Sequence, residues 1–350
     1  MVQSKSVVYA KLPDGFPVPG ETLVVESKDV DISTAPEGGV AIKVLLVSVD
    51  PYMRGRMRDE SKTTSYSSAF TLGEPIDGGG LAKVLESNNP SFQPGDHVTG
   101  LIPHSEYVVL DAQRAKTLRK IHNPYNLPLE RFVGVLGMPG LTAYASLYEI
   151  GELHRSEKET IFITAASGAV GSLVGQLAKR EGLRVVGSAG SDEKVKYLVE
   201  KLGFDAAFNY KTESPKEALA KYIPEGLDIY YDNVGGETLE AAIDNAKPHA
   251  RFIECGMISQ YNRKEDEEPY GVRNLMEIVK KKLKIQGFIV GDIGAKYAEQ
   301  FQKDVQKWLH EGSITYQEDV TVGIENEAEG FVRMLRGQNF GKAVIKYADA

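Results

Sequence analysis

The middle of the chain alternates short apolar runs with amphipathic segments. Residues 160–190 read TIFITAASGAVGSLVGQLAKREGLRVVGSAG. The apolar run at 160–166 predicts a buried parallel strand, which a Ser-Gly pair ends. Apolar residues at helical spacing predict a helix over 170–181, and the next apolar run predicts a strand at 184–188. Strand, glycine turn, helix and strand form a βαβ unit whose helix N-terminus offers N–H groups to a pyrophosphate.

The glycine turn is an incomplete form of the dinucleotide fingerprint G-x-G-x-x-G. From 166 to 171 the chain reads Ala-Ser-Gly-Ala-Val-Gly, so the first glycine is absent while Gly168 and Gly171 are present. A purely structural turn is the alternative interpretation. The strand before the turn and the helix after it favour dinucleotide binding.

The second strand of the unit favours NADPH over NADH. NAD sites place an acidic residue near the end of this strand to bind the ribose 2′-hydroxyl, whereas a cationic neighbour accommodates a 2′-phosphate. Here the strand ends without a carboxylate, and Lys194 follows in a helix for which Ser191 is the expected N-cap. The alternative for Lys194 is an ordinary solvated lysine. We interpret Asp192 and Glu193 as first-turn helix acids rather than ribose ligands.

The alternation continues to about residue 290. Further strands are predicted at 206–209, 227–232, 251–256 and 284–290. Helices are predicted between them at 192–202, 215–222, 237–246 and 272–282. Six strands alternating with helices predict an α/β fold with a doubly wound parallel sheet.

The first 130 residues have a different pattern. Short apolar or alternating runs separated by Pro, Gly and Asn predict a β-rich barrel or sandwich, with strands at 6–10, 40–49, 80–85, 97–101 and 106–109. Residues 59–68 read as an exposed loop. A helix at 295–311 precedes a strand, helix and strand at 315–321, 327–336 and 342–347. We expect domains at 1–130 and 131–305, with 306–350 returning to the first.

Composition narrows the function classes. The chain has 350 residues and a net charge of −8, so it lacks the basic footprint of a nucleic-acid or anionic-membrane binder. No apolar run reaches the length of a membrane span, and the N-terminus lacks the apolar core of a signal peptide. A single cysteine, Cys255, excludes an internal disulfide and fits a reducing, cytoplasmic setting.

Seven ordered stretches resemble the zinc-independent branch of the medium-chain dehydrogenases/reductases, within it the NADP-dependent alkenal double-bond reductases and leukotriene/prostaglandin reductases. They are the glycine turn at 165–171, VDPYMR at 49–54, LGMPGLTAY at 136–144, FNYK at 208–211, DNVGG at 232–236, CGMISQYN at 255–262 and NFGK at 339–342. The resemblance runs from about residue 40 to the end. It implies a GroES-like β-rich domain joined to a Rossmann NADP-binding domain, with the substrate in the cleft between them.

The resemblance also implies which residues contact NADP(H). The phosphate turn corresponds to Gly168, Ala169, Val170 and Gly171. The 2′-phosphate is expected at Ser188, Lys194 and Tyr210. Further cofactor contacts are expected at Asn233, Cys255, Gly256, Met257, Ile258, Ser259, Gln260, Tyr261, Phe288, Ile289, Val290 and Asn339. For Tyr210 alone, and for Asn339, a surface loop residue or a turn residue remains the alternative.

Two tyrosines carry the expected chemistry. Reducing an α,β-unsaturated carbonyl needs a hydride at the β-carbon, stabilisation of the developing enolate oxygen and a proton at the α-carbon. Tyr261 matches the family's active-site tyrosine and is expected to stabilise the enolate or donate the proton; the cofactor ribose 2′-hydroxyl is its rival, and packing against the nicotinamide is the alternative. Tyr52 is expected in the substrate pocket or at a domain interface. Met138 and Pro139 are expected near the nicotinamide.

The residues argue against a zinc site. One cysteine cannot form a Cys₄ site, and LGEP at 72–75 stands where zinc alcohol dehydrogenases place Gly-His-Glu. The histidines lack short ligand spacing and are expected to be surface or satisfied loop residues: His97, His104, His122, His154, His249 and His310. Plant relatives often carry a pocket tyrosine where Gly79 stands here, so the resemblance predicts one aromatic wall fewer.

Together these features predict an NADPH-dependent reductase of C=C bonds in small enals and enones. A quinone oxidoreductase on the same scaffold is the nearest alternative, because the cofactor motifs do not distinguish the two. A non-catalytic NADPH-binding protein is an alternative from another class. The family resemblance implies a homodimer. No metal, nucleic-acid partner or membrane association is expected.

Overall fold

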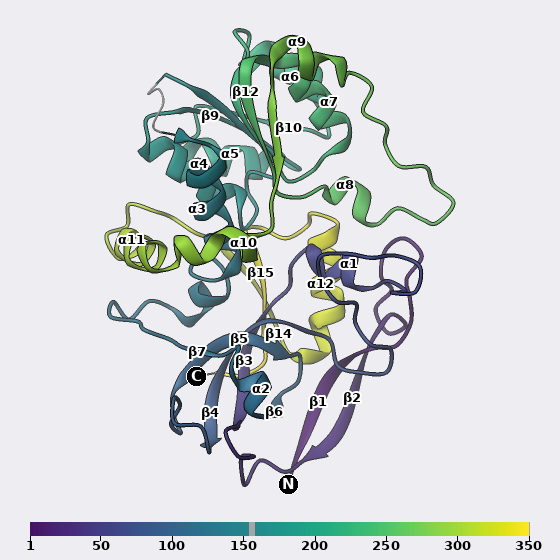
Figure 1. The fold of residues 1–350 in the computed structure, drawn as a ribbon, viewed down its shortest axis with the longest axis vertical. Helices are drawn as coiled ribbons and strands as arrows, with labels where there is room; N and C mark the ends of the chain where they lie inside the picture. The colour runs from purple at the N-terminus through teal and green to yellow at the C-terminus, as the bar shows by residue number, and fades with distance from the viewer. Residues whose placement is uncertain (154–157, 350) are drawn as a thin grey trace. The chain divides into compact units, whose positions relative to one another are not determined.

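The computed structural model describes residues 1–153 and 158–349. His154, one of the histidines considered above, lies outside the described residues. The chain divides into two compact units, the first formed by Met1–Gly137 with Glu318–Ala350 and the second by Met138–Gln317. Figure 1 shows the ribbon of both.

The second unit contains a six-stranded sheet in the order β10-β9-β8-β11-β12-β13, and all five neighbouring pairs are parallel. Its strands are β8 (Thr160–Ile163), β9 (Arg184–Ala189), β10 (Ala206–Asn209), β11 (Leu227–Asp232), β12 (Ala246–Glu254) and β13 (Lys284–Gly287). The order reverses direction beside β8, the first strand along the chain. This arrangement is the Rossmann doubly wound sheet, and it confirms the predicted fold class.

Helices cover the sheet of the second unit. Helix α3 (Met138–Ile150) packs with α4 (Gly171–Arg180), and α6 (Pro215–Tyr222) packs with α7 (Gly236–Asn245). The remaining helices are α5 (Asp192–Glu200), α8 (Ile258–Tyr261), α9 (Met276–Lys281), α10 (Val290–Ile293), η3 (Gly294–Lys296) and α11 (Ala298–His310). Beneath α7, the aromatic rings of Phe162, Phe208 and Tyr230 stack in a buried cluster. Strands β10, β8 and β11 supply these rings, and Val186 of β9, the strand between β10 and β8, is buried in the same cluster, so the apolar runs of the sequence form one core.

Two strands of the second unit end three residues sooner than predicted, and β12 ends two residues sooner. The run at 160–166 is a strand only to Ile163, because the chain turns there and Ala165 takes the left-handed backbone conformation with φ 46°. The run at 284–290 is a strand only to Gly287, and α10 begins at Val290. Residues 164–166 and 288–290 therefore lie just past the carboxyl ends of their strands, where the predicted cofactor contacts cluster.

The first unit is β-rich, as predicted. A seven-stranded sheet has the order β14-β15-β3-β4-β5-β7 with β6 paired to β3, and β1 and β2 form a separate antiparallel pair. The strands are β1 (Val2–Tyr9), β2 (Leu23–Val30), β3 (Val40–Ser48), β4 (Asp77–Ser87), β5 (His97–Pro103), β6 (Tyr107–Leu110), β7 (Arg119–Lys120), β14 (Glu318–Val322) and β15 (Lys342–Lys346). Its helices are α1 (Tyr52–Arg56), α2 (Ala112–Ala115), η1 (Leu129–Val133), η4 (Ile324–Asn326) and α12 (Glu327–Leu335).

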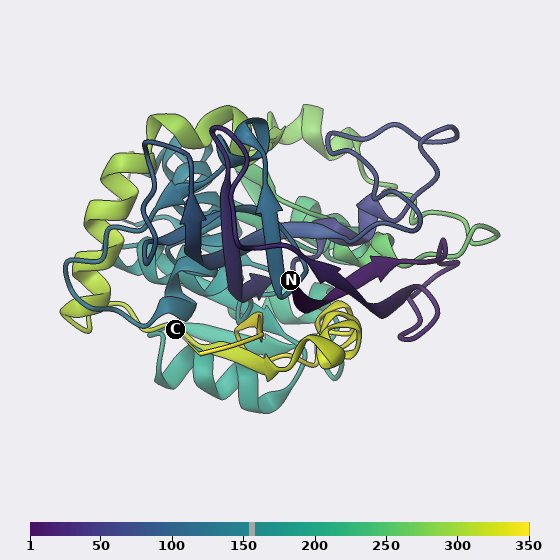
Figure 2. The same cartoon turned by 90° about the horizontal axis from the view of Figure 1, so that it is seen from below.

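The C-terminal segment belongs to the core of the first unit. Strand β15 pairs antiparallel with β3, and Phe331 and Ile345 are buried in one cluster with the N-terminal strands. The yellow segment lies beside the purple and blue elements of this unit in both views (Figure 1 and Figure 2). The chain returns to the first unit at Glu318, whereas the sequence analysis placed the return at residue 306.

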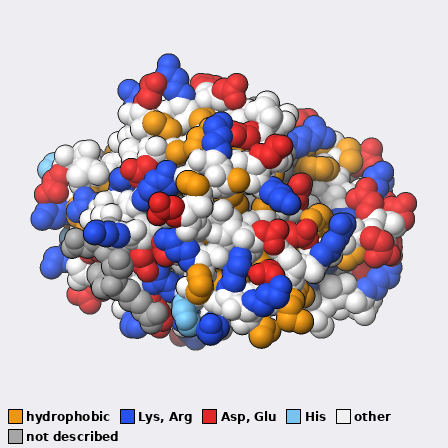
Figure 3. Space-filling model, turned by 90° about the horizontal axis from the view of Figure 1, so that it is seen from above, with side chains coloured by type: hydrophobic (Ala, Val, Ile, Leu, Met, Phe, Trp, Pro, Cys, Tyr) orange, Lys and Arg blue, Asp and Glu red, His pale blue; other side chains and the backbone are white. Residues whose placement is uncertain are grey.

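The surface carries mixed charge. Lysine and arginine side chains are interspersed with aspartate and glutamate over the face shown in Figure 3. Among the described residues, no helix is long and apolar enough to cross a membrane.

Candidate cofactor and active site

The glycine turn after β8 brings the backbone of strand and helix into close contact. A Cβ on Gly171 would lie 2.7 Å from the Ala165 carbonyl oxygen and 2.8 Å from Ala166 Cα. Only glycine fits there. The Gly168 N–H donates to the Ala165 carbonyl at 2.9 Å, which closes the turn just before α4. Helix α4 begins at the end of this turn, and the N-terminus of a helix after a strand is a place where phosphate oxygens can bind.

A residue that the sequence did not single out supports this turn. The Tyr316 hydroxyl donates to the Ala169 carbonyl at 3.0 Å. The two residues are 147 positions apart in the chain, so no local pattern signals the contact. Tyr316 lies near the end of the second unit and fixes one carbonyl of the phosphate turn.

Three residues predicted to hold the 2′-phosphate lie at the carboxyl ends of β9 and β10. Ser188 is buried in β9, and a Cβ on Gly190 would lie 3.1 Å from the Tyr210 hydroxyl, so this ring lies against the end of β9. Lys194 is 9% exposed in the first turn of α5, and its backbone N–H donates to the Ser191 hydroxyl at 3.3 Å. Ser191 is thus the N-cap, as expected.

The acidic residues beside Lys194 have structural roles that match the sequence interpretation. Asp192 accepts a hydrogen bond from the Asn209 side chain at 2.8 Å, which ties the end of β10 to the start of α5. Glu193 is exposed in the same helical turn.

Burial raises the pKa of the neighbouring Tyr210, so its hydroxyl stays protonated and able to donate.

The loop after β11 is anchored to the end of β8. The Asn233 N–H donates to the Thr164 hydroxyl at 2.8 Å, and its side-chain amide donates to the Thr164 carbonyl at 2.7 Å. Its carbonyl accepts the Ile258 N–H at 3.2 Å. Asn233 therefore joins three strand ends, β8, β11 and β12, at one edge of the sheet.

Tyr261 ends the short helix α8, just past β12. Its hydroxyl accepts the Met257 N–H at 3.1 Å, and a Cβ on Gly256 would lie 2.8 Å from that hydroxyl. The ring therefore folds back over the glycine that follows Cys255. A phenol hydroxyl both accepts and donates hydrogen bonds, so the Met257 contact is compatible with a donor role toward substrate.

The other residues predicted after β12 and β13 line the same edge of the sheet. Ser259 donates to the Val234 carbonyl at 2.6 Å, and Gln260 donates to the Ser259 hydroxyl at 3.2 Å. The Met257 side chain lies over Gly235, where a Cβ would come within 2.8 Å of it. Phe288 and Ile289 connect β13 to α10, which begins with Val290.

Tyr52 and Asn339 belong to the first unit. Tyr52 begins α1 and packs against the core of this unit. Burial, followed by the charge of Asp50, raises the pKa of the Tyr52 hydroxyl, so it is a neutral donor. The Asn339 side chain donates to the Gly341 carbonyl at 2.7 Å within the turn before β15. This contact is the one expected of the turn-residue alternative.

A buried lysine supports the turn that presents Tyr52. Lys342 is 1% exposed, and its ammonium lies 3.2 Å from an Asp50 carboxylate oxygen. It also donates to the Val49 and Ala343 carbonyls, each at 2.7 Å. Burial lowers the pKa of Lys342, and Asp50 opposes that shift. Both residues lie in the matched stretches at 49–54 and 339–342, but nothing in the sequence indicated that they pair.

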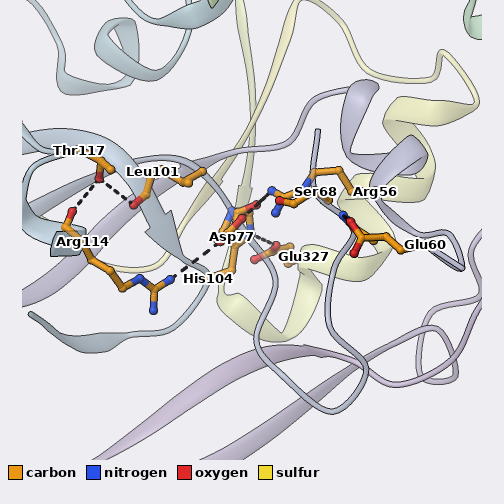
Figure 4. A network of polar contacts seen from close by, with 10 residues as sticks. Arg56, Glu60, Ser68, Asp77, Leu101, His104, Arg114, Thr117 and Glu327 are labelled. Atoms are coloured by element: carbon orange, nitrogen blue, oxygen red, sulfur yellow. Dashed lines mark hydrogen bonds and ion pairs between the residues drawn. The ribbon is translucent and has the colours of Figure 1, made fainter. Parts of the chain in front are cut away.

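A polar network lies inside the same unit (Figure 4). Arg56 pairs with Asp77 at 2.5 Å, and Arg114 approaches the other Asp77 oxygen at 3.9 Å. Close by, the His104 ring is fully buried with its Nδ1 bonded to Glu327. Glu327 opens α12, so the pair connects the end of β5 with the C-terminal helix.

The expectation for the histidines is wrong at His104 and His97. Both have an Nε2 atom that is buried with no hydrogen-bond partner among the described residues. A Cβ on Gly78 would lie 2.9 Å from the His104 Nε2, so this glycine makes room for the ring. At Gly79, by contrast, an added Cβ would meet only Ser48 Cβ, at 3.6 Å. Within the described part of the chain, no three His, Cys, Asp or Glu side chains are grouped to hold a metal ion.

Known proteins share both units. One family model, described as the N-terminal domain of oxidoreductase, matches residues 5–118, and another, described as zinc-binding dehydrogenase, matches 169–311. The NADP-dependent oxidoreductase RED1 of Cochliobolus heterostrophus is 49% identical over 100% of this chain and 99% of its own. The NADP(+)-dependent 2-alkenal reductase of Nicotiana tabacum is 44% identical, with 98% of this chain and 97% of its own covered. The crystal structure of CurA from Vibrio vulnificus in complex with NADPH superposes with a TM-score of 0.89 at 34% identity, covering 99% of this chain and 100% of that one.

A Rossmann sheet with a phosphate turn, joined in one chain to a GroES-like sheet, defines a medium-chain dehydrogenase/reductase. Full-length identities of this size place the chain more narrowly. It belongs to the family of NADP-dependent alkenal and enone reductases, and NADP(H) is its cofactor.

Proposed function

We propose that this protein reduces the C=C bond of α,β-unsaturated aldehydes and ketones. The observation that carries the proposal is the 44% identity, over nearly the whole of both chains, to a tobacco enzyme named as a 2-alkenal reductase. The position of Tyr261 supports it, because a phenol hydroxyl at the end of α8, in the segment after β12, is a donor of the kind that an enolate oxygen requires.

The residues at the strand ends fit NADPH. The turn from Gly168 to Gly171 leaves no room for a side chain at its end, which suits close approach of a pyrophosphate. Ser188, Lys194 and Tyr210 would hold the 2′-phosphate, with the Lys194 ammonium supplying the charge. Asn233, the segment at 255–261 and Phe288–Val290 would hold the nicotinamide half. When bound, NADPH supplies a hydride to the substrate β-carbon.

The protein's part in the reaction is to stabilise charge and deliver a proton. As the β-carbon receives hydride, negative charge develops on the carbonyl oxygen, and a hydrogen bond from the Tyr261 hydroxyl would stabilise it. A proton then reaches the α-carbon from the Tyr261 hydroxyl or from solvent. The cofactor ribose 2′-hydroxyl is the rival donor to the enolate. Tyr52, a neutral donor in the first unit, would orient the substrate carbonyl.

Quinone reduction is the second candidate function, because the same cofactor-binding residues would serve it. The test is to measure kcat/KM with NADPH for a series of 2-alkenals, enones and quinones under one set of conditions. We expect the enals or enones to give the larger values. Quinone turnover far above enal turnover would reverse the assignment, and the absence of NADPH oxidation with every compound would favour a binding protein.

A homodimer would form through the open edge of the Rossmann sheet. Strand β13 is the last strand of the described sheet, and all four of its residues are exposed. Leu275, Met276 and Val279 on and before the neighbouring helix α9 are each more than half exposed. An unpaired strand edge next to exposed apolar side chains favours pairing with a second copy. Sedimentation or light scattering would measure the mass in solution.

A further inference from the structure

Two carboxyl groups lie side by side beneath the predicted cofactor loops. In the parallel register, Asp232 at the end of β11 is the partner of Glu254 at the end of β12. Tyr230, two residues before Asp232, points to the same face of the sheet and is fully buried, as is Asp232. The two acids therefore end adjacent strands on one buried face.

The two carboxyl groups differ in their hydrogen-bond donors. Asp232 Oδ1 accepts the N–H groups of Val234 and Gly235, each at 2.8 Å. The other Asp232 oxygen, both Glu254 oxygens and the Tyr230 hydroxyl are buried, and within the described part of the chain none has a hydrogen-bond partner at normal distance. Backbone N–H donors favour the ionised form of Asp232, whereas no donor favours ionisation of Glu254.

Two buried neighbouring carboxylates do not both ionise near neutral pH, because each opposes the charge of the other. We propose that Glu254 is protonated beside an ionised Asp232, and that this pair is a positioning device for the two loops that bind the cofactor. Glu254 acts through Asp232 and does not itself contact the reacting atoms. The inference rests on the cofactor contacts proposed above for Asn233 and for the segment at 255–261.

The pair supports both loops directly. The side chain of Asp232 holds Val234 and Gly235 in the loop after β11. Its backbone carbonyl accepts the N–H groups of Cys255 at 2.9 Å and Gly256 at 3.1 Å in the loop after β12. Movement of Asp232 would therefore displace both predicted nicotinamide-binding segments together.

The titration of Glu254 gives a measurable signature. Burial, and secondarily the charge of Asp232, raises the pKa of Glu254 to about 9. Burial also raises the pKa of Asp232. The other titratable groups facing the pair are Tyr230, whose pKa burial raises well above its usual value, and Cys255, whose pKa burial raises to about 12. Above about pH 9, Glu254 would ionise first and repel Asp232.

NADPH binding over a range of pH tests the proposal. The Kd for NADPH, measured by its fluorescence without any enal, is followed from pH 7 to 10.5 in the whole protein. We expect the wild-type Kd to rise about tenfold between pH 8 and 10, because binding selects the protonated form. Glu254→Gln keeps an uncharged donor and is expected to bind within about threefold of wild type at pH 7, with no rise near pH 9.

A matched variant separates the effect of Glu254 from other losses of NADPH binding at high pH. Glu225→Gln changes an exposed glutamate before β11 and should keep the wild-type pH profile. A loss of binding at high pH that does not involve Glu254 would appear equally in all variants. The same alkaline rise in Glu254→Gln as in wild type, or a wild-type Kd that is flat to pH 10, would overturn the proposal.

An infrared measurement on the wild-type protein gives a second test that does not depend on whether the variants fold. Wild-type protein at pH 8 should show the C=O stretch of a protonated carboxyl group, and this band should disappear by pH 10.5. Its absence at pH 8 would also overturn the proposal. Neither measurement uses a substrate. A protein that does not reduce enals could therefore still support or overturn the role of Glu254, and the two proposals are tested independently.

Discussion

Substitution of the buried Lys342 gives a direct test of what stabilises the first unit. Lys342→Met keeps the volume of the stem and removes three contacts, to Asp50 at 3.2 Å and to the Val49 and Ala343 carbonyls at 2.7 Å. Asp50 is 4% exposed, so its carboxylate would be left buried without a cation. Breaking a buried pair in this way costs about 3–5 kcal/mol. For a unit of roughly 170 residues, this corresponds to a fall of about 6–20 °C in Tm.

Lys346→Met is the matched control, since it lies on the same strand. Lys346 pairs with Asp349 at 2.7 Å, but the Asp349 side chain is 91% exposed, so the loss should stay below about 1 kcal/mol. Thermal unfolding of both variants measures the difference. In Lys342→Met with Asp50→Asn no charge remains buried, and we expect at least half of the lost stability to return. A Tm for Lys342→Met no lower than for Lys346→Met would refute the reasoning.

The remaining substitutions test the second unit. Lys194→Ala should raise KM for NADPH about 10- to 150-fold through loss of a charge-assisted contact of about 1.5–3 kcal/mol, with little effect on NADH; equal effects on both cofactors would contradict a 2′-phosphate role. Tyr261→Phe should lower kcat for an enal by about 100-fold with an unchanged Kd for NADPH, and an unchanged kcat would remove Tyr261 from the chemistry. Val279→Glu should yield monomers in light scattering, whereas an intact dimer would place the interface elsewhere.

The pH dependence of stability gives a related readout for Glu254. Its pKa in the folded protein, about 9, exceeds the value of 4.5 expected for an unfolded glutamate. The folded state therefore binds one more proton between these values, and its stability falls as pH rises from about 4.5 to 9. Urea unfolding of wild type and Glu254→Gln from pH 6 to 9 should show a smaller loss in the variant. Parallel profiles would argue against a protonated Glu254.

Strands and helices with local signals were predictable. The bounds predicted for β11 and α6 match the structure, because one is a short apolar run and the other begins with a Ser-Pro cap. Strand β2 was missed, since only Leu23 of its eight residues is buried and its polar residues give no alternating pattern. The four-residue helix α8, which carries Tyr261, is too short for helical periodicity to reveal.

The buried polar pairs were not predictable, because they join distant segments. His104 and Glu327 are separated by 223 positions, and Lys342 reaches a carbonyl 293 positions away. A single sequence shows these residues as ordinary charged or polar positions. Only the folded chain shows that each is buried and what it contacts. The resemblance located the cofactor loops, whereas the contacts of Asp232 and Tyr316 that support them come from the tertiary structure.

The absent first glycine of the fingerprint leads to a last prediction. The left-handed conformation falls on Ala165, with φ 46°, while Ala166 is a buried residue whose Cβ would lie 2.8 Å from a Cβ on Gly187. An L-residue in this conformation costs roughly 1–2 kcal/mol, and glycine avoids this cost but loses about 0.4–1 kcal/mol through the flexibility of the unfolded chain. Ala165→Gly should therefore be neutral or stabilising by up to about 1.6 kcal/mol in urea unfolding. Ala166→Gly, which only loses a buried methyl group and adds flexibility, should destabilise by about 1 kcal/mol or more. Equal destabilisation by both substitutions would show that Ala165 bears no strain.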